Sequence, residues 1–188
     1  MIYLASSSPR RRALLKEAKI RFAILRPTYR ETDGRDRLPM QLTKRHAEAK
    51  ARSSALKVRN GIVLSADTVV YFKKKILGKP KNRAHAFQML GALSGHWHEV
   101  ITAVALLKIR DGRIIKKIIF SEKSHVLLKK MDKSAIKRYF KKIHPLDKAG
   151  AYALQSKDVS IVERVRGSRS NVVGLPMEKL KMRLDVLG

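Results

Sequence analysis

The sequence contains no cysteine, which excludes disulfides, thiolate metal sites and a cysteine nucleophile. Aromatic residues make up only 6% of the chain. No apolar run approaches the roughly 18 residues that a membrane-spanning helix needs. The apolar stretch Ile2 to Ala5 is also too short for a secretory signal peptide, and its charges follow it instead of preceding it. We therefore expect a cytoplasmic protein with no membrane partner.

Acidic residues are scarce as well, with 15 Asp and Glu against 43 Lys and Arg, so the net charge is +28. An anionic partner such as a nucleotide, a nucleic acid or an anionic surface would suit such a charge. The basic residues nevertheless recur along the whole chain, as in Lys73-Lys74-Lys75 and Lys129-Lys130. This spread favours a generally basic, solvated surface, because a dedicated footprint should cluster on one element or face.

The length and the hydrophobic pattern indicate one domain over residues 1–188 with a mixed α/β fold. The chain is 44% hydrophobic and can bury a core. Asp111-Gly112 between two β-branched runs predicts a hairpin, and helical and strand periods alternate before it. We expect a twisted mixed sheet with flanking helices, in the α/β or α+β class. The expected strands are 2–5, 22–25, 62–72 with a polar interruption at 65–68, 100–109, 114–128, 160–165 and 171–173; helices are expected at 9–18 and 40–56 and from residues 82, 132 and 176.

The stretch LASSSPRRRALL combines a helix start with unfavourable charges. Ser8 suits an N-cap and Pro9 suits the first helical position. The positive end of the helix dipole repels the arginines at positions 10, 11 and 12. A polyanion bound there would relieve this penalty, because backbone amides and guanidinium groups would hold it together. The stretch therefore predicts a phosphate site.

Three more charged residues occupy unusual places. Asp67 lies in an apolar strand run, and a lone buried carboxylate is costly, so it either marks a bulge or strand end or has a function. Lys50 lies on a helix face between Ala47 and Ala51, and Lys79 lies in the turn LGKP. Each lysine alone is also compatible with a solvated or snorkelling side chain.

Other polar residues leave alternatives open. Gln155 follows the apolar segment AGAYAL and either hydrogen-bonds a base edge or ends a strand. His96 and His98 share one strand face, but no third ligand is evident, so we do not expect a zinc site. We expect metal chemistry to use the oxygens of Asp67 and Glu31, with Mg²⁺ or Mn²⁺ as the ion.

Together these residues suit one ligand, a nucleoside triphosphate. It carries about four negative charges, which arginine and lysine bind directly. Carboxylates would hold a divalent ion that bridges phosphate oxygens. The set comprises Arg10, Arg11, Lys50, Lys79, Glu31 and Asp67.

These residues lie in motifs that resemble the Maf family of nucleotide pyrophosphatases, in order and nearly from end to end. The motifs are LASSSPRR, SADTVV, LGKP, LSGHWHEVITAV, PLDKAGAYALQ and VVGLP, with Glu31 and Lys50 between the first two. The resemblance implies a Maf/ITPase-like fold with two lobes around an active-site cleft. It also implies hydrolysis of a nucleoside triphosphate to the monophosphate and pyrophosphate.

The resemblance also implies residue roles and a substrate. Asp67 would be the proton acceptor and, with Glu31, would hold the metal and the water. The triphosphate would be bound by Arg10, Arg11, Lys50 and Lys79. Arg10, Thr68 and Gln155 match the branch similar to dTTP/UTP pyrophosphatases. Departures at Ala153, Ser156 and 166–170 leave the base preference less defined than the reaction.

A second hypothesis belongs to another class of protein. The net charge of +28 also suits a basic nucleic-acid-binding or cell-division-regulating protein with a vestigial nucleotide pocket. Weak nonspecific nucleic-acid binding is compatible with catalysis, and the sequence leaves a homodimer open.

Overall fold

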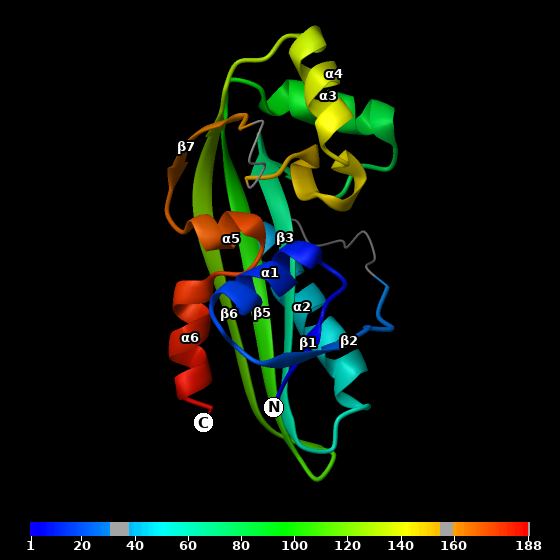
Figure 1. Cartoon of the computed structure of the whole chain (residues 1–188), viewed down its shortest axis with the longest axis vertical. Coiled ribbons are helices and arrows are strands. Elements are labelled where there is room, and N and C mark those ends of the chain that lie inside the picture. The colour runs from blue at the N-terminus through cyan, green and yellow to red at the C-terminus, as the bar shows by residue number, and fades with distance from the viewer. Residues whose placement is uncertain (31–37, 155–159, 188) are drawn as a thin grey trace.

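The computed structural model describes residues 1–30, 38–154 and 160–187, and its centre is a seven-stranded mixed sheet (Figure 1). Six strands lie in the order β2-β1-β3-β5-β6-β7, and β4 pairs with β3. β1 runs parallel to β2 and β3, whereas β3, β5, β6 and β7 pair antiparallel. The strands are β1 Ile2–Ala5, β2 Phe22–Leu25, β3 Gly61–Phe72, β4 Lys75–Leu77, β5 Trp97–Arg110, β6 Arg113–Leu128 and β7 Val162–Arg166.

The predicted hairpin is confirmed and forms the longest feature of the sheet. Asp111 and Gly112 connect β5 to β6 with φ values of 49° and 74°. Positive φ at both central residues is what a type I′ turn requires, and this turn matches the twist of the two strands. The β5–β6 pair extends from the turn to the far end of the molecule (Figure 1).

Helices cover both faces of the sheet. Ser8, Asn82 and Asp132 cap α1, α3 and α4 as the sequence predicts, each accepting a hydrogen bond from a backbone N–H of the first turn. Within the described ranges, no helix is long and apolar enough to cross a membrane. The helices are α1 Pro9–Glu17, α2 Pro39–Ala55, α3 Arg83–Leu93, α4 Lys133–Lys142, α5 Arg169–Val173 and α6 Met177–Asp185, with 3₁₀ turns η1 Pro145–Asp147 and η2 Ala149–Ala151.

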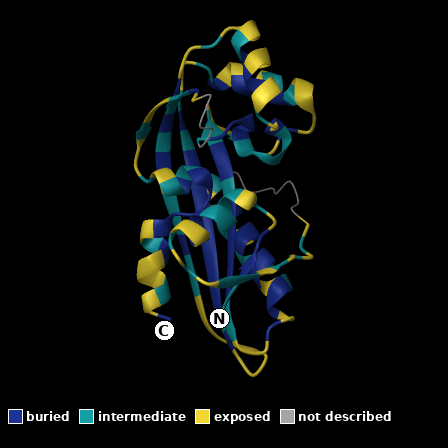
Figure 2. Ribbon diagram, in the orientation of Figure 1, coloured by how far each residue is buried: buried dark blue, intermediate teal, exposed yellow. Residues whose placement is uncertain are grey.

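The alternation of side chains along β3 divides the core around β1, β3 and β5 into two layers, one on each face of the sheet. Leu64 packs with residues of α1 and α6, whereas Val63 packs with small residues of α2, such as Ala47 and Ala51. Successive strand residues point to opposite faces, so these helices cover opposite faces of one sheet. A third cluster joins α3 and α4 to the far ends of β5 and β6. The central strands are the most deeply buried part (Figure 2).

Two expectations about the strands are wrong. β3 runs without interruption through 65–68, because its buried polar side chains have partners: the Ser65 hydroxyl donates to the Ala47 carbonyl, and Asp67 pairs with Lys50. The segment 171–173 is the end of helix α5, not a strand. The Ser168 hydroxyl caps it by accepting from the Asn171 N–H at 3.0 Å, and such local bonds compete with a strand ladder.

Candidate functional site

A cavity of about 940 Å³ opens beside β3, where the start of α1, helix α2, the β4 turn and the η1–η2 segment meet. Its described lining contains seven Lys and Arg side chains but only two carboxylates, Asp67 and Asp147. Walls of one charge sign focus the field in a cleft and attract anions. The cavity therefore suits a polyanionic ligand. The cations are Arg10, Arg11, Arg26, Lys50, Lys79, Lys81 and Lys148.

Strand β3 divides its polar residues between the two sides of the sheet. Asp67 has the same parity as Val63 and meets α2, whereas Thr68 has the parity of Leu64 and meets α1. One strand thus brings side chains from both layers to the same cavity. This placement supports the functional interpretation of Asp67, because the residue lies at neither a bulge nor a strand end.

Asp67 is buried at the cavity wall with two basic neighbours from one face of α2. The Lys50 ammonium donates to Oδ1 at 2.6 Å, and His46 Nδ1 lies 3.5 Å from Oδ2. Burial alone would raise the pKa of Asp67, but the His46 imidazole and the charges of Lys50 and Arg11 outweigh it and lower the pKa below its ordinary value. Asp67 is therefore ionised at neutral pH.

Arg11 connects the start of α1 to β3 and to the C-terminal part of the chain. Its guanidinium group donates from Nε to the Gly174 carbonyl at 2.8 Å and from Nη2 to Thr68 Oγ1 at 3.1 Å. Nη1 donates to Ser6 Oγ at 3.2 Å. The fork is thus held in one orientation at the cavity wall. Thr68 Oγ1 also lies 2.9 Å from Thr102 Oγ1, so Thr68 acts on the site through Arg11.

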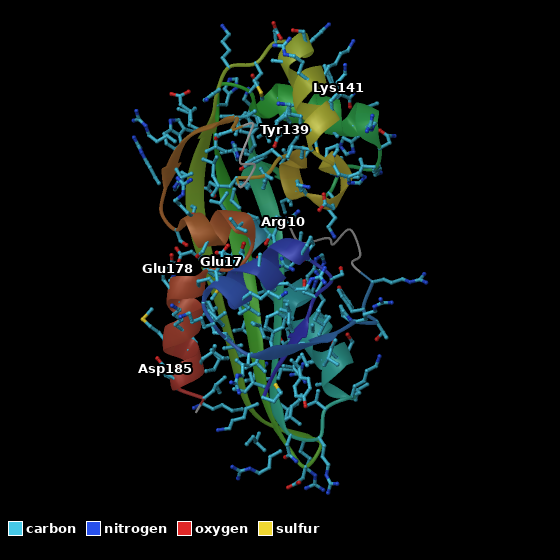
Figure 3. The ribbon with its side chains drawn as sticks, in the orientation of Figure 1. Arg10, Glu17, Tyr139, Lys141, Glu178 and Asp185 are labelled. Atoms are coloured by element: carbon cyan, nitrogen blue, oxygen red, sulfur yellow. The ribbon has the colours of Figure 1, made fainter. Side chains whose placement is uncertain are left out.

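Arg10 lies at the start of the same helix (Figure 3), and its guanidinium group reaches η1. It donates to the Asp147 carboxylate at 2.8 Å and to the Asp147 carbonyl at 3.0 Å. Burial raises the pKa of Asp147, but the bonds from Lys148 and Arg10 outweigh this and lower the pKa to about 2. This bridge joins residues 137 positions apart in the sequence and closes the cavity wall between α1 and η1.

Lys79 lies at the rim, on the turn between β4 and α3, and its side chain is exposed. The turn is held to the η2 segment by a hydrogen bond from Gly150 N–H to the Gly78 carbonyl at 3.1 Å. Gly150 has φ +68°, and a Cβ there would lie 2.9 Å from Val70 Cγ2. The close approach therefore requires glycine at position 150.

Behind the η2 wall, two buried rings hold the segment that leads toward residue 155. His98 Nδ1 donates to the His96 carbonyl at 3.4 Å, so His98 Nε2 accepts from the Tyr152 hydroxyl at 2.7 Å. Burial is the main cause that lowers the pKa of His98, to about 4, and it raises the pKa of Tyr152. Both rings are neutral at pH 7. The Ala153 N–H donates to the Tyr139 hydroxyl at 3.1 Å, which holds the same segment from the other side.

The structure brings six predicted residues to this cavity, and two others lie outside the described residues. Glu31 and Gln155 are the latter pair. The cavity lining contains Arg10, Arg11, Lys50, Asp67 and Lys79, together with Thr68.

Several residues of the cavity were not predicted as site residues from the sequence, among them His46, Asp147 and Lys148. His46 had a detectable signal, because it lies one helical turn before Lys50 and therefore on the same face. Asp147 and Lys148 occur in the motif PLDKAGAYALQ, but their contact with Arg10 depends on tertiary structure.

The oxygen donors at Asp67 fit a hard divalent cation. Mg²⁺ is usually held by one or two carboxylates together with substrate phosphates, not by a protein-only cage. Among the described residues, no group of three or more His, Cys, Asp or Glu side chains converges. Since the described residues offer no protein-only cage, a cation at Asp67 would complete its coordination with oxygens of the ligand. The ammonium group of Lys50 also lies at the Asp67 carboxylate and adds positive charge there.

Comparisons with known proteins agree on one family. A family model described as Maf-like protein matches residues 1–187. A dTTP/UTP pyrophosphatase of Thermosipho melanesiensis is 42% identical over 95% of this chain and 93% of its own. A dTTP/UTP pyrophosphatase of Caldicellulosiruptor saccharolyticus is 41% identical over 100% of this chain and 94% of its own. The similarity thus covers the full set of motifs.

A solved structure supports the fold. The Staphylococcus aureus Ham1 protein superposes with a TM-score of 0.54 at 14% identity, covering 100% of this chain and 99% of that protein. At this identity the similarity concerns the arrangement of the sheet and helices alone.

Proposed function

The chain belongs to the Maf family, and from this membership and the geometry of the cavity we propose that it hydrolyses a nucleoside triphosphate to the monophosphate and pyrophosphate. The observation that carries the proposal is Asp67, an ionised carboxylate buried beside Lys50 in a cavity whose charged lining residues are mostly cations. A buried carboxylate kept ionised in a cationic site combines a proton acceptor with a binding site for phosphate.

The cations divide into fixed and adjustable groups. Arg11 and Arg10 are held in place by protein acceptors, so their guanidinium groups form a rigid, positively charged wall for phosphate oxygens. Lys79 is exposed at the rim and can follow the terminal phosphates of the substrate. Lys148 lies beside Asp147 and adds positive charge on the η1 side. The triphosphate would lie between the arginines of α1 and the η1 side of the cavity.

The chemical step needs one proton acceptor and a leaving group that is neutralised. A water molecule transfers a proton to Asp67 as its oxygen attacks the α-phosphorus. The bond from the α-phosphorus to the bridging oxygen breaks, and the electron pair leaves with pyrophosphate. Lys50, Lys79 and Arg11 stabilise the added negative charge, and electrostatic stabilisation of this kind supplies several kcal/mol.

A divalent cation, Mg²⁺ or Mn²⁺, would be held by Asp67 together with phosphate oxygens, and Glu31 is the second carboxylate that we propose for it. When bound, it would neutralise charge on the phosphate oxygens. Asp67 fits this role because its oxygens are hard donors at the cavity wall.

The proposed substrates are dTTP and UTP. The relatives carry that name at 36–42% identity over nearly the whole chain. Arg10, Thr68 and Gln155 are the residues proposed to select the base. Thr68 would act by orienting Arg11, since its hydroxyl is bonded to that guanidinium group. A glutamine amide at position 155 can pair with the O4/N3 edge of a pyrimidine.

We also propose that residues 1–188 form one domain, because the family model spans residues 1–187. The homodimer and the cytoplasmic location stay predictions.

The direct test is to incubate the protein with a panel of ribo- and deoxyribonucleoside triphosphates, with Mg²⁺ or Mn²⁺, and to measure pyrophosphate and orthophosphate separately. We expect pyrophosphate as the product, with dTTP and UTP hydrolysed fastest. Release of orthophosphate in place of pyrophosphate would refute attack at the α-phosphorus. Equal rates for purine and pyrimidine nucleotides would refute the proposed base selection and leave the reaction intact.

A further inference from the structure

Helix α4 and the residues that precede it carry a dense cluster of cations away from the cavity described above. Between residues 129 and 142 the only acidic residue is Asp132. We call the seven cations of this segment the α4 basic face; all seven side chains are exposed: Lys129, Lys130, Lys133, Lys137, Arg138, Lys141 and Lys142. Figure 3 labels Lys141 on this helix.

The cations of the α4 basic face form no ion pair with a carboxylate of the described residues. Asp132 is occupied in capping the helix, because its carboxylate accepts from the Ala135 N–H at 2.7 Å and the Ser134 hydroxyl at 2.9 Å. Arg138 donates to the Ser134 hydroxyl at 3.0 Å. No ion pair within 1–30, 38–154 and 160–187 includes a member of this face.

Three of these lysines form a regular row. Lys133, Lys137 and Lys141 follow each other at intervals of four residues, so they lie on one face of the helix about 6 Å apart along its axis. Like charges at this spacing destabilise a helix by about 0.2–0.5 kcal/mol per pair. A polyanion lying along the row would add attractive interactions with each lysine and so offset this repulsion.

A second cavity of about 330 Å³ lies at the other edge of the α4 basic face, and the three lysines of the row are not part of its lining. Its described lining combines four members of the α4 basic face with an apolar floor and contains no carboxylate. A volume near 300 Å³ lies at the lower end of small-ligand sites. The cavity shares no described lining residue with the larger one. The cations are Lys129, Lys130, Arg138 and Lys142, and the apolar floor is formed by Met131, Ala135, Tyr139 and Ile161.

We propose that the α4 basic face binds single-stranded nucleic acid, with phosphates along the lysine row and across the helix to Arg138 and Lys142, and with one unpaired base in the cavity that these two side chains line. The row supplies sequence-independent attraction to the backbone. The cavity supplies an apolar surface that only an unpaired base can enter. An anionic membrane fits less well, because the apolar side chains of α4, Ile136, Tyr139 and Phe140, are buried in the core and unavailable for insertion.

The test uses fluorescence anisotropy with a labelled single-stranded oligonucleotide of mixed sequence, titrated with the full chain at several salt concentrations. One variant combines Lys133→Gln, Lys137→Gln and Lys141→Gln. Its matched control combines Lys57→Gln, Arg110→Gln and Arg113→Gln, which removes the same charge from exposed positions near the β5–β6 turn. That turn lies at the opposite end of the molecule from α4 (Figure 1).

We expect the α4 triple variant to bind at least about tenfold more weakly, and its slope of log K against log salt to be smaller by about two, because each single-strand phosphate contact contributes about 0.7. The control should keep nearly all of the affinity. A third variant, Ala135→Leu, fills the cavity and leaves the charge unchanged. It should weaken single-strand binding several-fold without changing the salt slope.

The outcomes that would overturn the proposal are distinct. Equal losses in the α4 triple variant and the control would mean that binding is diffuse and has no site. Tighter binding of a duplex of the same sequence, or of vesicles of anionic lipid, would refute the choice of partner. Normal binding by Ala135→Leu would refute the role of the cavity. Pyrophosphate release should be unchanged in all three variants, so failure here leaves the proposed enzymatic function untouched.

Discussion

The central cavity and the α4 basic face are both strongly cationic, but they hold their charges in opposite ways. In the cavity, Arg10 and Arg11 donate to protein acceptors, and Lys50 lies 2.6 Å from Asp67. On α4, exposed lysines such as Lys133 and Lys141 have no carboxylate partner among the described residues. Arg10, Arg11 and Lys50 are thus fixed by protein partners, whereas the lysines of the α4 basic face, like Lys79 at the cavity rim, are exposed.

This difference follows from what each site has to do. Hydrolysis at a single phosphorus atom requires donors placed before the substrate arrives, since reorganisation during the reaction would cost part of the stabilisation. Nonspecific attraction to a polyanion needs charge density and tolerates mobile side chains. The number of protein partners of each cation therefore distinguishes a catalytic site from a nonspecific binding surface more clearly than net charge does.

The largest effect on turnover is expected from neutralising Asp67 in the cavity. Asp67→Asn should reduce pyrophosphate release by about 10²–10⁴-fold, the usual contribution of a general base. The amide is nearly the same size but cannot accept the proton from water. Steady-state kinetics with dTTP measures the loss, and circular dichroism checks that the fold is retained.

The matched control is Asp132→Asn, which removes a carboxylate from the α4 cap. It should lower the unfolding free energy only slightly, because asparagine is also a favoured N-cap residue, and it should leave turnover unchanged. Near wild-type turnover in Asp67→Asn would contradict the role of Asp67.

The second effect concerns acid sensitivity, which should be greater at the cavity than at α4. His98 is buried behind the cavity wall, and its pKa is lowered to about 4 from the ordinary 6.5. The unfolded chain therefore takes up this proton at a higher pH than the folded chain. The stabilisation is complete above pH 6.5 and is lost as the pH falls from about 6.5 to 4, up to about 3 kcal/mol.

A His98→Gln variant isolates this contribution, because glutamine can still accept from the Tyr152 hydroxyl but does not titrate. Urea unfolding of both proteins at several pH values gives the difference in unfolding free energy. The advantage of the native protein should shrink steadily between pH 6.5 and 4. A difference that stays constant across this interval would show that His98 does not titrate as its burial implies.

Much of the fold was predictable from local patterns, because the decisive signals lie close together in the sequence. Ser8 and Asn82 cap the helices that follow them, and Asp111-Gly112 forms the predicted turn. The segment 171–173 was predicted wrongly. Its β-branched pair favours a strand, but the amide of Asn171 is held by the Val100 carbonyl and the Ser124 hydroxyl, which are distant in sequence.

The candidate site was predictable where a residue is unusual in its own segment. Asp67 stands out in an apolar strand, and Arg11 stands out at a helix N-terminus. Asp147 carries no such signal, since an acidic residue in a polar turn is ordinary. Its role arises from contact with Arg10, which depends on how α1 and η1 pack. Partners of this kind cannot be inferred from one sequence alone.

The third prediction compares two neighbouring arginines that differ in how firmly they are held. Arg11 donates to three acceptors among the described residues, whereas Arg12 donates to the Ser7 carbonyl at 3.4 Å. Arg11→Ala should lower the unfolding free energy by about 2 kcal/mol, because charged hydrogen bonds to Thr68 and Gly174 are lost. It should also lower kcat/KM more than tenfold, whereas Arg12→Ala should change both quantities little. Equal effects on kcat/KM would contradict the separation of the two residues.

The smallest effect is a gain in stability, and it tests the difference between the cavity and the α4 basic face directly. Lys137 has Lys133 and Lys141 one helical turn away on either side, so each pair is repulsive. Lys137→Gln should therefore raise the unfolding free energy by about 0.5 kcal/mol at low salt. Thermal unfolding at low and high ionic strength measures this gain, which should vanish in about 1 M salt because exposed charges are then screened. Destabilisation by Lys137→Gln at low salt would mean that this lysine is held by the fold, as the cavity cations are.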